Sequence, residues 1–377
     1  MGAYLDAASG RPLHPVARDA LLAALEEGWA DPGRLHGPAR RTAMLLDAAR
    51  ESIAESIGAR ADEVSFAANG TQALHIALLG TLRGNRRAGP TLVHSAVEHS
   101  AVLAVAQAHA DSGGDAVCIG VDQLGRVLAR DFVEAARRPG TAAAALQAAN
   151  HEVGTTQPIE EVVAEIGPTP LVVDATQTLG HLAPPSSWSV LVGDARAWGG
   201  PNVGIVAVRT GQRWRPSWPV DEREAGRVPG VPDVPSIVAA AASLRAVQAQ
   251  ADEQAQRLHD VIDRIRAAVP AAIADVEVLG DPVGRLPHIV TFSFLYVDGE
   301  ALVGALDRRG FAVSSGSSCT SSTLEPSHVL VAMGALTSGN IRISIQQQTT
   351  DQEISEFLAV LPSAVAAVRA ELGASGL

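Results

Sequence analysis

Apolar positions in the first half of the chain follow two different spacings. Residues 15–27, 40–58, 71–83 and 98–110 carry apolar side chains at helical spacing, which predicts helices. Short apolar runs, many followed by turn residues, predict buried strands. These runs lie at 91–94, 116–121, 142–148, 170–174, 189–192 and 204–209. The alternation predicts an α/β fold with a mostly parallel sheet covered by helices, and a ligand crevice beyond the carboxyl ends of the strands.

The pattern changes after residue 210. Residues 211–235 are rich in Pro, Arg and Trp and predict an irregular connection, and the Ala-rich stretch 236–269 predicts one long helix. Further on, the chain alternates again between short apolar runs and helical spacing. Strands are expected at 276–280, 288–294 and 341–345, and helices near 299–309 and 351–372. We therefore expect an N-terminal segment (1–14) near the small domain, a large domain (15–255) and a small α+β domain (256–377).

Charge and composition narrow the function classes. The formal net charge of −12 argues against a general role in binding nucleic acid or anionic membranes, so the arginine clusters at 83–87 and 213–215 are expected to be solvated surface. No apolar run reaches membrane-spanning length, and a cytoplasmic location is expected by default. Two cysteines cannot make a disulfide framework. Cys118, inside a strand run, is expected in the core, whereas Cys319 stands in a Gly/Ser-rich loop and is expected to be reactive.

Three segments carry candidate chemistry near the ends of predicted strands. Gly70 and Thr71 open a helix, where backbone N–H groups attract phosphate. His99 opens another helix. Asp174 closes a buried apolar strand, and a carboxylate there costs free energy unless a charged or hydrogen-bonding group meets it. Asp174 is therefore the best candidate that the residues alone provide.

The order of these segments resembles the cysteine desulfurases of the class V aminotransferase group, which are fold type I enzymes that use pyridoxal 5'-phosphate (PLP). The resemblance runs nearly end to end and rests on several short motifs. They are Tyr4-Leu5-Asp6-Ala7-Ala8-Ser9, Asp31 to His36, Asn69-Gly70-Thr71-Gln72, His99, Asn150-His151-Glu152-Val153-Gly154, Asp174-Ala175-Thr176-Gln177, Ser315-Gly316-Ser317-Ser318-Cys319 and Asn340-Ile341-Arg342-Ile343-Ser344. The resemblance implies the same fold, with a large and a small domain and a homodimer.

The resemblance also implies how a cofactor would be held. Asp174 would pair with the pyridine nitrogen, Gln177 and His151 would contact the ring substituents, and His99 would stack on the ring and shuttle protons. The phosphate would lie against Gly70 and Thr71. Arg196 departs from the family pattern, but its guanidinium could supply a further, bidentate phosphate contact.

On the substrate side, the resemblance implies that Arg342, with Asn150, binds the carboxylate of L-cysteine. Cys319 as thiolate would take the sulfur as a persulfide and pass it to an acceptor protein. No metal site is expected.

The chain departs from the family pattern around the cofactor. All 29 of its basic Lys and Arg residues are arginines, so the chain contains no lysine. The lysine that carries PLP as a Schiff base aligns with Ala197, a serine that touches the phosphate aligns with Asp194, and a histidine aligns with Arg196. A threonine that reaches a neighbouring subunit's phosphate aligns with Val231. If PLP binds at all, it must bind non-covalently.

Three accounts stay open at this point. In the first, Ala197 is an engineered substitution that abolishes activity. In the second, the chain is a natural divergent relative that keeps sulfur chemistry and takes sulfur from L-cysteine or from a persulfide donor. In the third, it is a catalytically inactive scaffold or regulatory partner of a sulfur-transfer system. The activity of the chain as written is expected to be strongly impaired.

Overall fold

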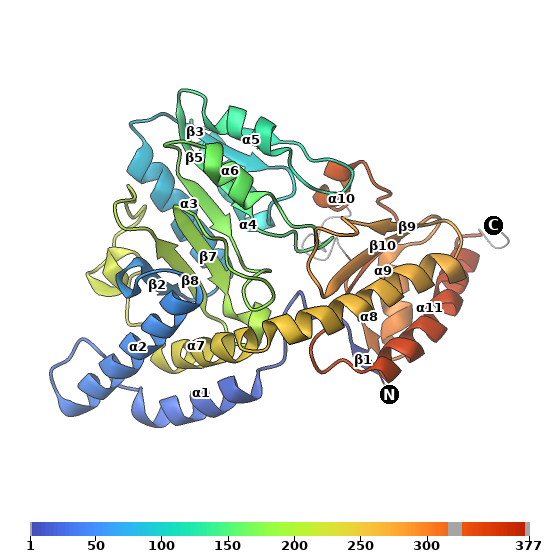
Figure 1. Cartoon of the computed structure of the whole chain (residues 1–377), viewed down its shortest axis with the longest axis horizontal. Coiled ribbons are helices and arrows are strands. Elements are labelled where there is room, and N and C mark those ends of the chain that lie inside the picture. Colours follow the sequence, from blue (N-terminus) through green and yellow to red (C-terminus); the bar gives the residue numbers. More distant parts are fainter. Residues whose placement is uncertain (1, 316–325, 374–377) are drawn as a thin grey trace.

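The largest sheet in the described part of the chain is mostly parallel, as predicted. The computed structural model describes residues 2–315 and 326–373, and in this part a seven-stranded sheet has the order β2-β8-β7-β6-β5-β3-β4 (Figure 1). Strands β3 to β7 pair in parallel, whereas β8 runs antiparallel to both of its neighbours. The strands are β2 (Val64–Ala67), β3 (Thr91–Ser95), β4 (Asp115–Ile119), β5 (Thr141–Gln147), β6 (Leu171–Asp174), β7 (Val190–Asp194) and β8 (Gly204–Val208).

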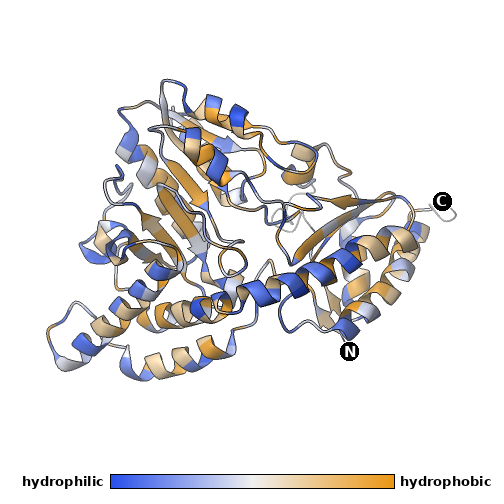
Figure 2. Ribbon diagram, viewed as in Figure 1, coloured by the Kyte–Doolittle hydropathy of each residue, from blue (hydrophilic) through white to orange (hydrophobic). Residues whose placement is uncertain are grey.

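Helices cover both faces of this sheet because its strands are apolar on both sides. Neighbouring residues of β6 enter opposite cores: Val173 packs with the helices of one face and Val172 with those of the other. Figure 2 shows hydrophobic residues along these strands. The helices are α1 (Pro15–Glu27), α2 (Gly37–Ser56), α3 (Gly70–Asn85), α4 (Ser100–Asp111), α5 (Ala129–Ala136), α6 (Ile159–Glu165) and α7 (Val234–Gln248). Single 3-10 turns lie at Ala61–Glu63, Ala195–Trp198 and Arg223–Gly226.

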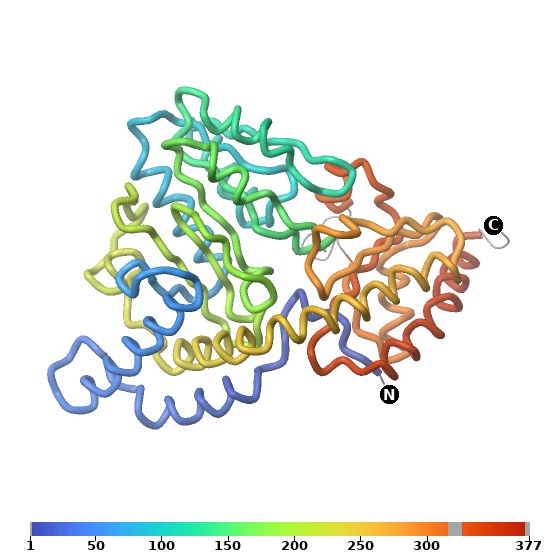
Figure 3. The backbone as a smooth tube through the Cα atoms, viewed as in Figure 1, coloured from blue at the N-terminus to red at the C-terminus, as the bar shows by residue number. Residues whose placement is uncertain are grey.

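A second, antiparallel sheet is built from the C-terminal part of the chain. Its strands are β9 (Val276–Leu279), β10 (Ile289–Phe294) and β12 (Asn340–Ser344), in the order β12-β10-β9. Helices α8 (Ala251–Ala272), α9 (Gly299–Asp307) and α11 (Asp351–Glu371) share one apolar core with it, and α10 (His328–Met333) follows the undescribed residues 316–325. Strand β1 (Ala3–Tyr4) pairs with β11 (Phe311–Ala312), and Figure 3 shows the N-terminal segment crossing from there to α1. The domain boundaries themselves stay a prediction.

Two expectations from the sequence are wrong. Residues 236–269 do not form one helix: α7 ends at Gln248 and α8 begins at Ala251, because Gln250 leaves the helical conformation at φ −116°, ψ 2°. Cys118 is exposed and not in the core, because β4 is the edge strand of the large sheet. Among the described residues, no helix combines the length and the apolar character needed to cross a bilayer.

Candidate active site

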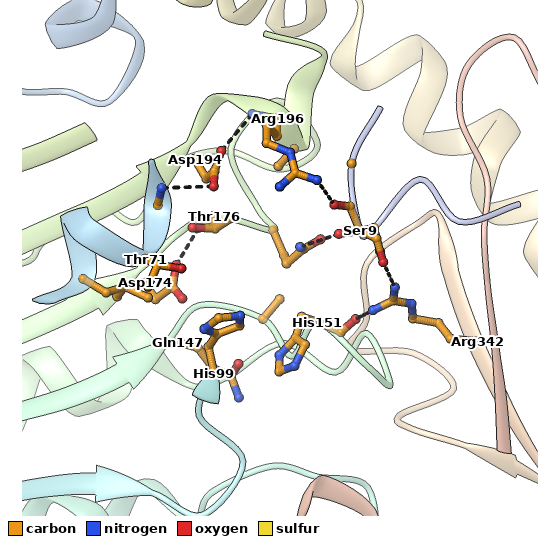
Figure 4. A pocket seen from close by; sticks show the side chains of 17 residues that line it. Ser9, Thr71, His99, Gln147, His151, Asp174, Thr176, Asp194, Arg196 and Arg342 are labelled. Carbon is orange, nitrogen blue, oxygen red and sulfur yellow. Dashed lines mark hydrogen bonds between the residues drawn. The ribbon is translucent and has the colours of Figure 1, made fainter. Parts of the chain in front are cut away.

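A pocket of about 330 Å³ lies where β5, β6 and β7 end, between the large sheet, the N-terminal segment and β12 (Figure 4). In parallel α/β sheets this is where ligands bind. The structure brings most of the predicted site residues together in its wall. They are Gly70, Thr71, His99, His151, Asp174, Gln177, Arg196, Ala197 and Arg342.

Asp174, His99 and Gln177 form one wall of the pocket. Asp174 ends β6, and its Oδ1 accepts a hydrogen bond from the Thr176 N–H at 2.9 Å. His99 caps α4, with Nδ1 accepting from the Ala101 N–H at 3.1 Å. That bond places the proton of the neutral ring on Nε2. The Gln177 amide donates to the Ala8 carbonyl at 3.1 Å.

His151 lies beside His99 in the lining of the pocket and adds a second imidazole ring (Figure 4). The residue is 8% exposed, and its ring meets that of His99 edge-on, with 5.2 Å between the centroids. Burial lowers the pKa of His151 well below its usual range, and the charges of His99 and Arg342 lower it further. Nδ1 of His151 has no hydrogen-bond partner among the described residues. A buried and neutral nitrogen without a partner is uncommon in folded proteins.

Arg342, the predicted carboxylate-binding residue, is already paired. It projects from β12, and its guanidinium donates to the His151 carbonyl at 2.8 Å, to Asp6 Oδ1 at 2.7 Å and to the Ser9 hydroxyl. A ligand carboxylate would therefore have to share this cation with Asp6. The sequence did not single out Asp6 and Ser9 as site residues, although both belong to the Tyr4–Ser9 motif.

Asp194 occupies the N-terminus of α3. One of its carboxylate oxygens accepts from the Gly70 N–H at 3.1 Å and the other from the Arg196 N–H at 3.0 Å (Figure 4). The fit is close, because a Cβ added to Gly70 would lie 2.6 Å from the Asp194 carboxylate. The Arg196 guanidinium donates to the Ser9 carbonyl at 2.7 Å. An anion of the protein itself thus fills the position where a helix N-terminus would receive a phosphate.

Ala197 is buried and lines the pocket, in the 3-10 turn that follows Asp194. Asn150 does not line it: its amide donates to the Val97 carbonyl at 3.0 Å and accepts from the Glu152 and Val153 N–H groups at 2.8 Å, so it stabilises a turn. Its role in substrate binding stays a prediction. Cys319 lies outside the described residues.

Two buried acids lie beside the pocket. Glu98 accepts from the Gln147 N–H at 3.0 Å, and burial raises its pKa well above the usual range, as does the charge of Asp174. Burial also raises the pKa of Glu152 to about 7, although the Ser327 hydroxyl donates to it at 2.6 Å. Apart from its position, nothing in the sequence marks either acid as a titrating group. Glu98 precedes His99, and Glu152 follows His151.

Comparison with known proteins agrees with this geometry. A family model described as "Aminotransferase class-V" matches residues 3–186 and 211–357. The gap between the two matches, residues 187–210, contains Asp194, Arg196 and Ala197.

Individual relatives match nearly the whole chain. "Cysteine desulfurase IscS" of Dictyoglomus turgidum is 32% identical over 97% of this chain and 95% of its own length. "Cysteine desulfurase" of Cereibacter sphaeroides is 35% identical over 97% and 96%. A solved structure titled "NifS-like protein" superposes with a TM-score of 0.89 at 25% identity, covering 96% of this chain and 99% of its own. The chain therefore belongs to the cysteine desulfurase family of class-V aminotransferases, with the fold type I architecture of that group.

Proposed function

We propose that this chain handles sulfur as cysteine desulfurases do, but receives it as a persulfide and relays it through Cys319 without PLP chemistry of its own. The family is PLP-dependent, so the proposal depends on whether the pocket fits that cofactor. The proposal also includes a homodimer, a sulfur-acceptor protein and a cytoplasmic location, as in the sequence-based expectation.

The pocket fits only half of PLP. Asp174, His99 and Gln177 suit a pyridine ring, and His151 lines the same pocket beside His99. The phosphate half does not fit, because the Asp194 carboxylate already takes the Gly70 N–H, and no lysine exists to hold the cofactor. The Asp194–Gly70 hydrogen bond is the observation that carries the proposal. We therefore assign no reaction step to PLP in this chain.

Persulfide relay needs no such cofactor. The Cys319 thiolate attacks the terminal sulfur of a donor persulfide, the donor's S–S bond breaks, and the donor leaves as a thiolate. Cys319 then carries the persulfide, and an acceptor thiolate takes the terminal sulfur by the same exchange. Bonds, charge and oxidation state balance without a further reactant. L-cysteine itself has no sulfur–sulfur bond, so it is not the direct donor in this route.

The test compares the sulfur bound by Cys319 with the sulfur bound by Cys118. The full-length protein is treated with glutathione persulfide, and bound sulfur is located by peptide mass spectrometry. The proposal predicts one added sulfur atom on Cys319, lost in Cys319→Ser and kept in the control Cys118→Ser. Cys118 is a suitable control because it is exposed on the edge strand β4. Equal labelling of both cysteines would contradict the relay. Labelling of neither cysteine would also contradict it and would favour the scaffold account.

A further inference from the structure

Five arginines from two separate segments line one groove on the surface. Arg83, Arg86 and Arg87 come from the end of α3 and the residues after it, and Arg213 and Arg215 from the loop that follows β8. We call this cavity, with a volume of about 380 Å³, the arginine groove. The sequence alone predicts that each of these two clusters is solvated surface. The structure joins them.

The groove is far from the pocket described above. Gly70 and Arg83 stand near opposite ends of α3, and thirteen residues of helix span roughly 20 Å at 1.5 Å per residue. None of the residues lining the groove also lines the pocket.

Close packing fixes the loop against the helix. The Trp214 ring lies directly on Gly80 of α3, where an added Cβ would come within 2.0 Å of the indole. A Cβ on Gly84 would lie 2.5 Å from the Arg213 carbonyl. The Arg215 N–H donates to the Gly80 carbonyl at 3.0 Å, and the Asn85 amide donates to the Arg213 carbonyl at 2.9 Å. Two glycines and two cross-contacts thus hold Arg213 and Arg215 beside the arginines of α3.

The charges in the groove are not compensated within the described part of the chain. None of the five guanidinium groups forms an ion pair or donates a hydrogen bond there, whereas Arg50, Arg209 and Arg223 each pair with a carboxylate. The C-terminal end of α3 accounts for Arg83, because cations stabilise helix C-termini. It does not account for two more arginines brought in by another loop. Like charges held together this way favour an anionic ligand.

We propose that the arginine groove binds a compact anion carrying several phosphoryl groups. Guanidinium groups match phosphate oxygens bidentately, and the cavity volume lies within the range of small-molecule sites. A compact anion fits better than a long nucleic acid, because the chain has 41 acidic residues against 29 basic ones and its acidic remainder repels an extended polyanion. The inference does not depend on the proposed sulfur relay.

Isothermal titration of the full-length protein with inorganic tripolyphosphate tests this site. The double variant Arg86→Gln/Arg213→Gln removes one charge from each side of the groove. The control double variant Arg137→Gln/Arg138→Gln removes the same total charge from the end of α5, outside the groove. We expect saturable binding that weakens at least tenfold in the groove variant and less than twofold in the control.

Three results would overturn the inference. The first is the absence of saturable binding. The second is an equal loss of affinity in both double variants, which would mean non-specific attraction. The third is that a thymidine oligonucleotide or poly-glutamate binds more tightly than tripolyphosphate through the same arginines. The last result would assign the groove to a macromolecular partner instead of a compact phosphate. Circular dichroism of each variant checks that the fold is kept.

Discussion

Replacing Asp194 with serine removes the carboxylate from the N-terminus of α3 and frees the Gly70 N–H to which it bonds at 3.1 Å. A phosphate brought to this position in the native chain would meet that carboxylate. Two unit charges about 4 Å apart repel by about 4 kcal/mol at an effective dielectric constant of about 20. Asp194 is partly exposed, so solvent screening reduces this value. If half of it remains, about 2 kcal/mol, the Asp194→Ser variant binds PLP roughly thirtyfold more tightly.

The assay is an absorbance titration of the native protein and the variant with PLP and, separately, with pyridoxal, which lacks the phosphate. The expected gain is specific to PLP, because the ring contacts from Asp174 and His99 are the same for both compounds. Asp19→Ser, on the exposed side of α1, changes the net charge equally and serves as the control. An equal gain for PLP and pyridoxal, or no gain for either, would refute the argument that Asp194 excludes the phosphate.

Three further predictions concern the same protein. The pKa of Glu152 is raised from 4.5 in the unfolded chain to about 7 in the folded protein, so the native chain loses stability as the pH rises from 4.5 through 7. Urea unfolding should therefore show Glu152→Gln gaining about 2.5 kcal/mol relative to the native chain between pH 5 and pH 8, and a pH-independent difference would contradict the assignment. Gly80→Ala should cost about 1–3 kcal/mol of stability and weaken tripolyphosphate binding, because its methyl group collides with Trp214, whereas Gly120→Ala, with open space around it, should change binding little. After borohydride reduction, the mass of the Ala197→Lys variant should show no attached PLP, whereas the variant that combines Ala197→Lys with Asp194→Ser should carry it. Attachment of PLP to the single variant would show that Asp194 does not exclude the cofactor.

Much of the fold could be predicted because both cores of the large sheet leave a local pattern. Runs such as 171–173 are apolar at every position, since neighbouring residues enter opposite cores, and the helices keep a single apolar stripe. The break at Gln250 could not be predicted, since no glycine or proline marks it. The exposure of Cys118 depends on the strand order, which a single strand's sequence does not encode.

The candidate site also has one part that could be predicted from the sequence and one part that could not. Residues at the ends of strands, such as Asp174, converge in the pocket because parallel strands end at one edge of the sheet. The hydrogen bond from the Gly70 N–H to Asp194 joins residues that are 124 positions apart, and the ion pair between Arg342 and Asp6 joins residues that are 336 positions apart. Such contacts are tertiary, and one sequence carries no local signal for them. The arginine groove was missed for the same reason.

The most direct test of the central claim is the formation of alanine from L-cysteine by the purified protein in the presence of excess PLP. The account predicts no alanine above the level given by PLP without protein, because the phosphate position is filled by Asp194 and no lysine is present. Sustained alanine production that is lost in Cys319→Ser would contradict it, and would show that this chain carries out cysteine desulfuration without the family's lysine.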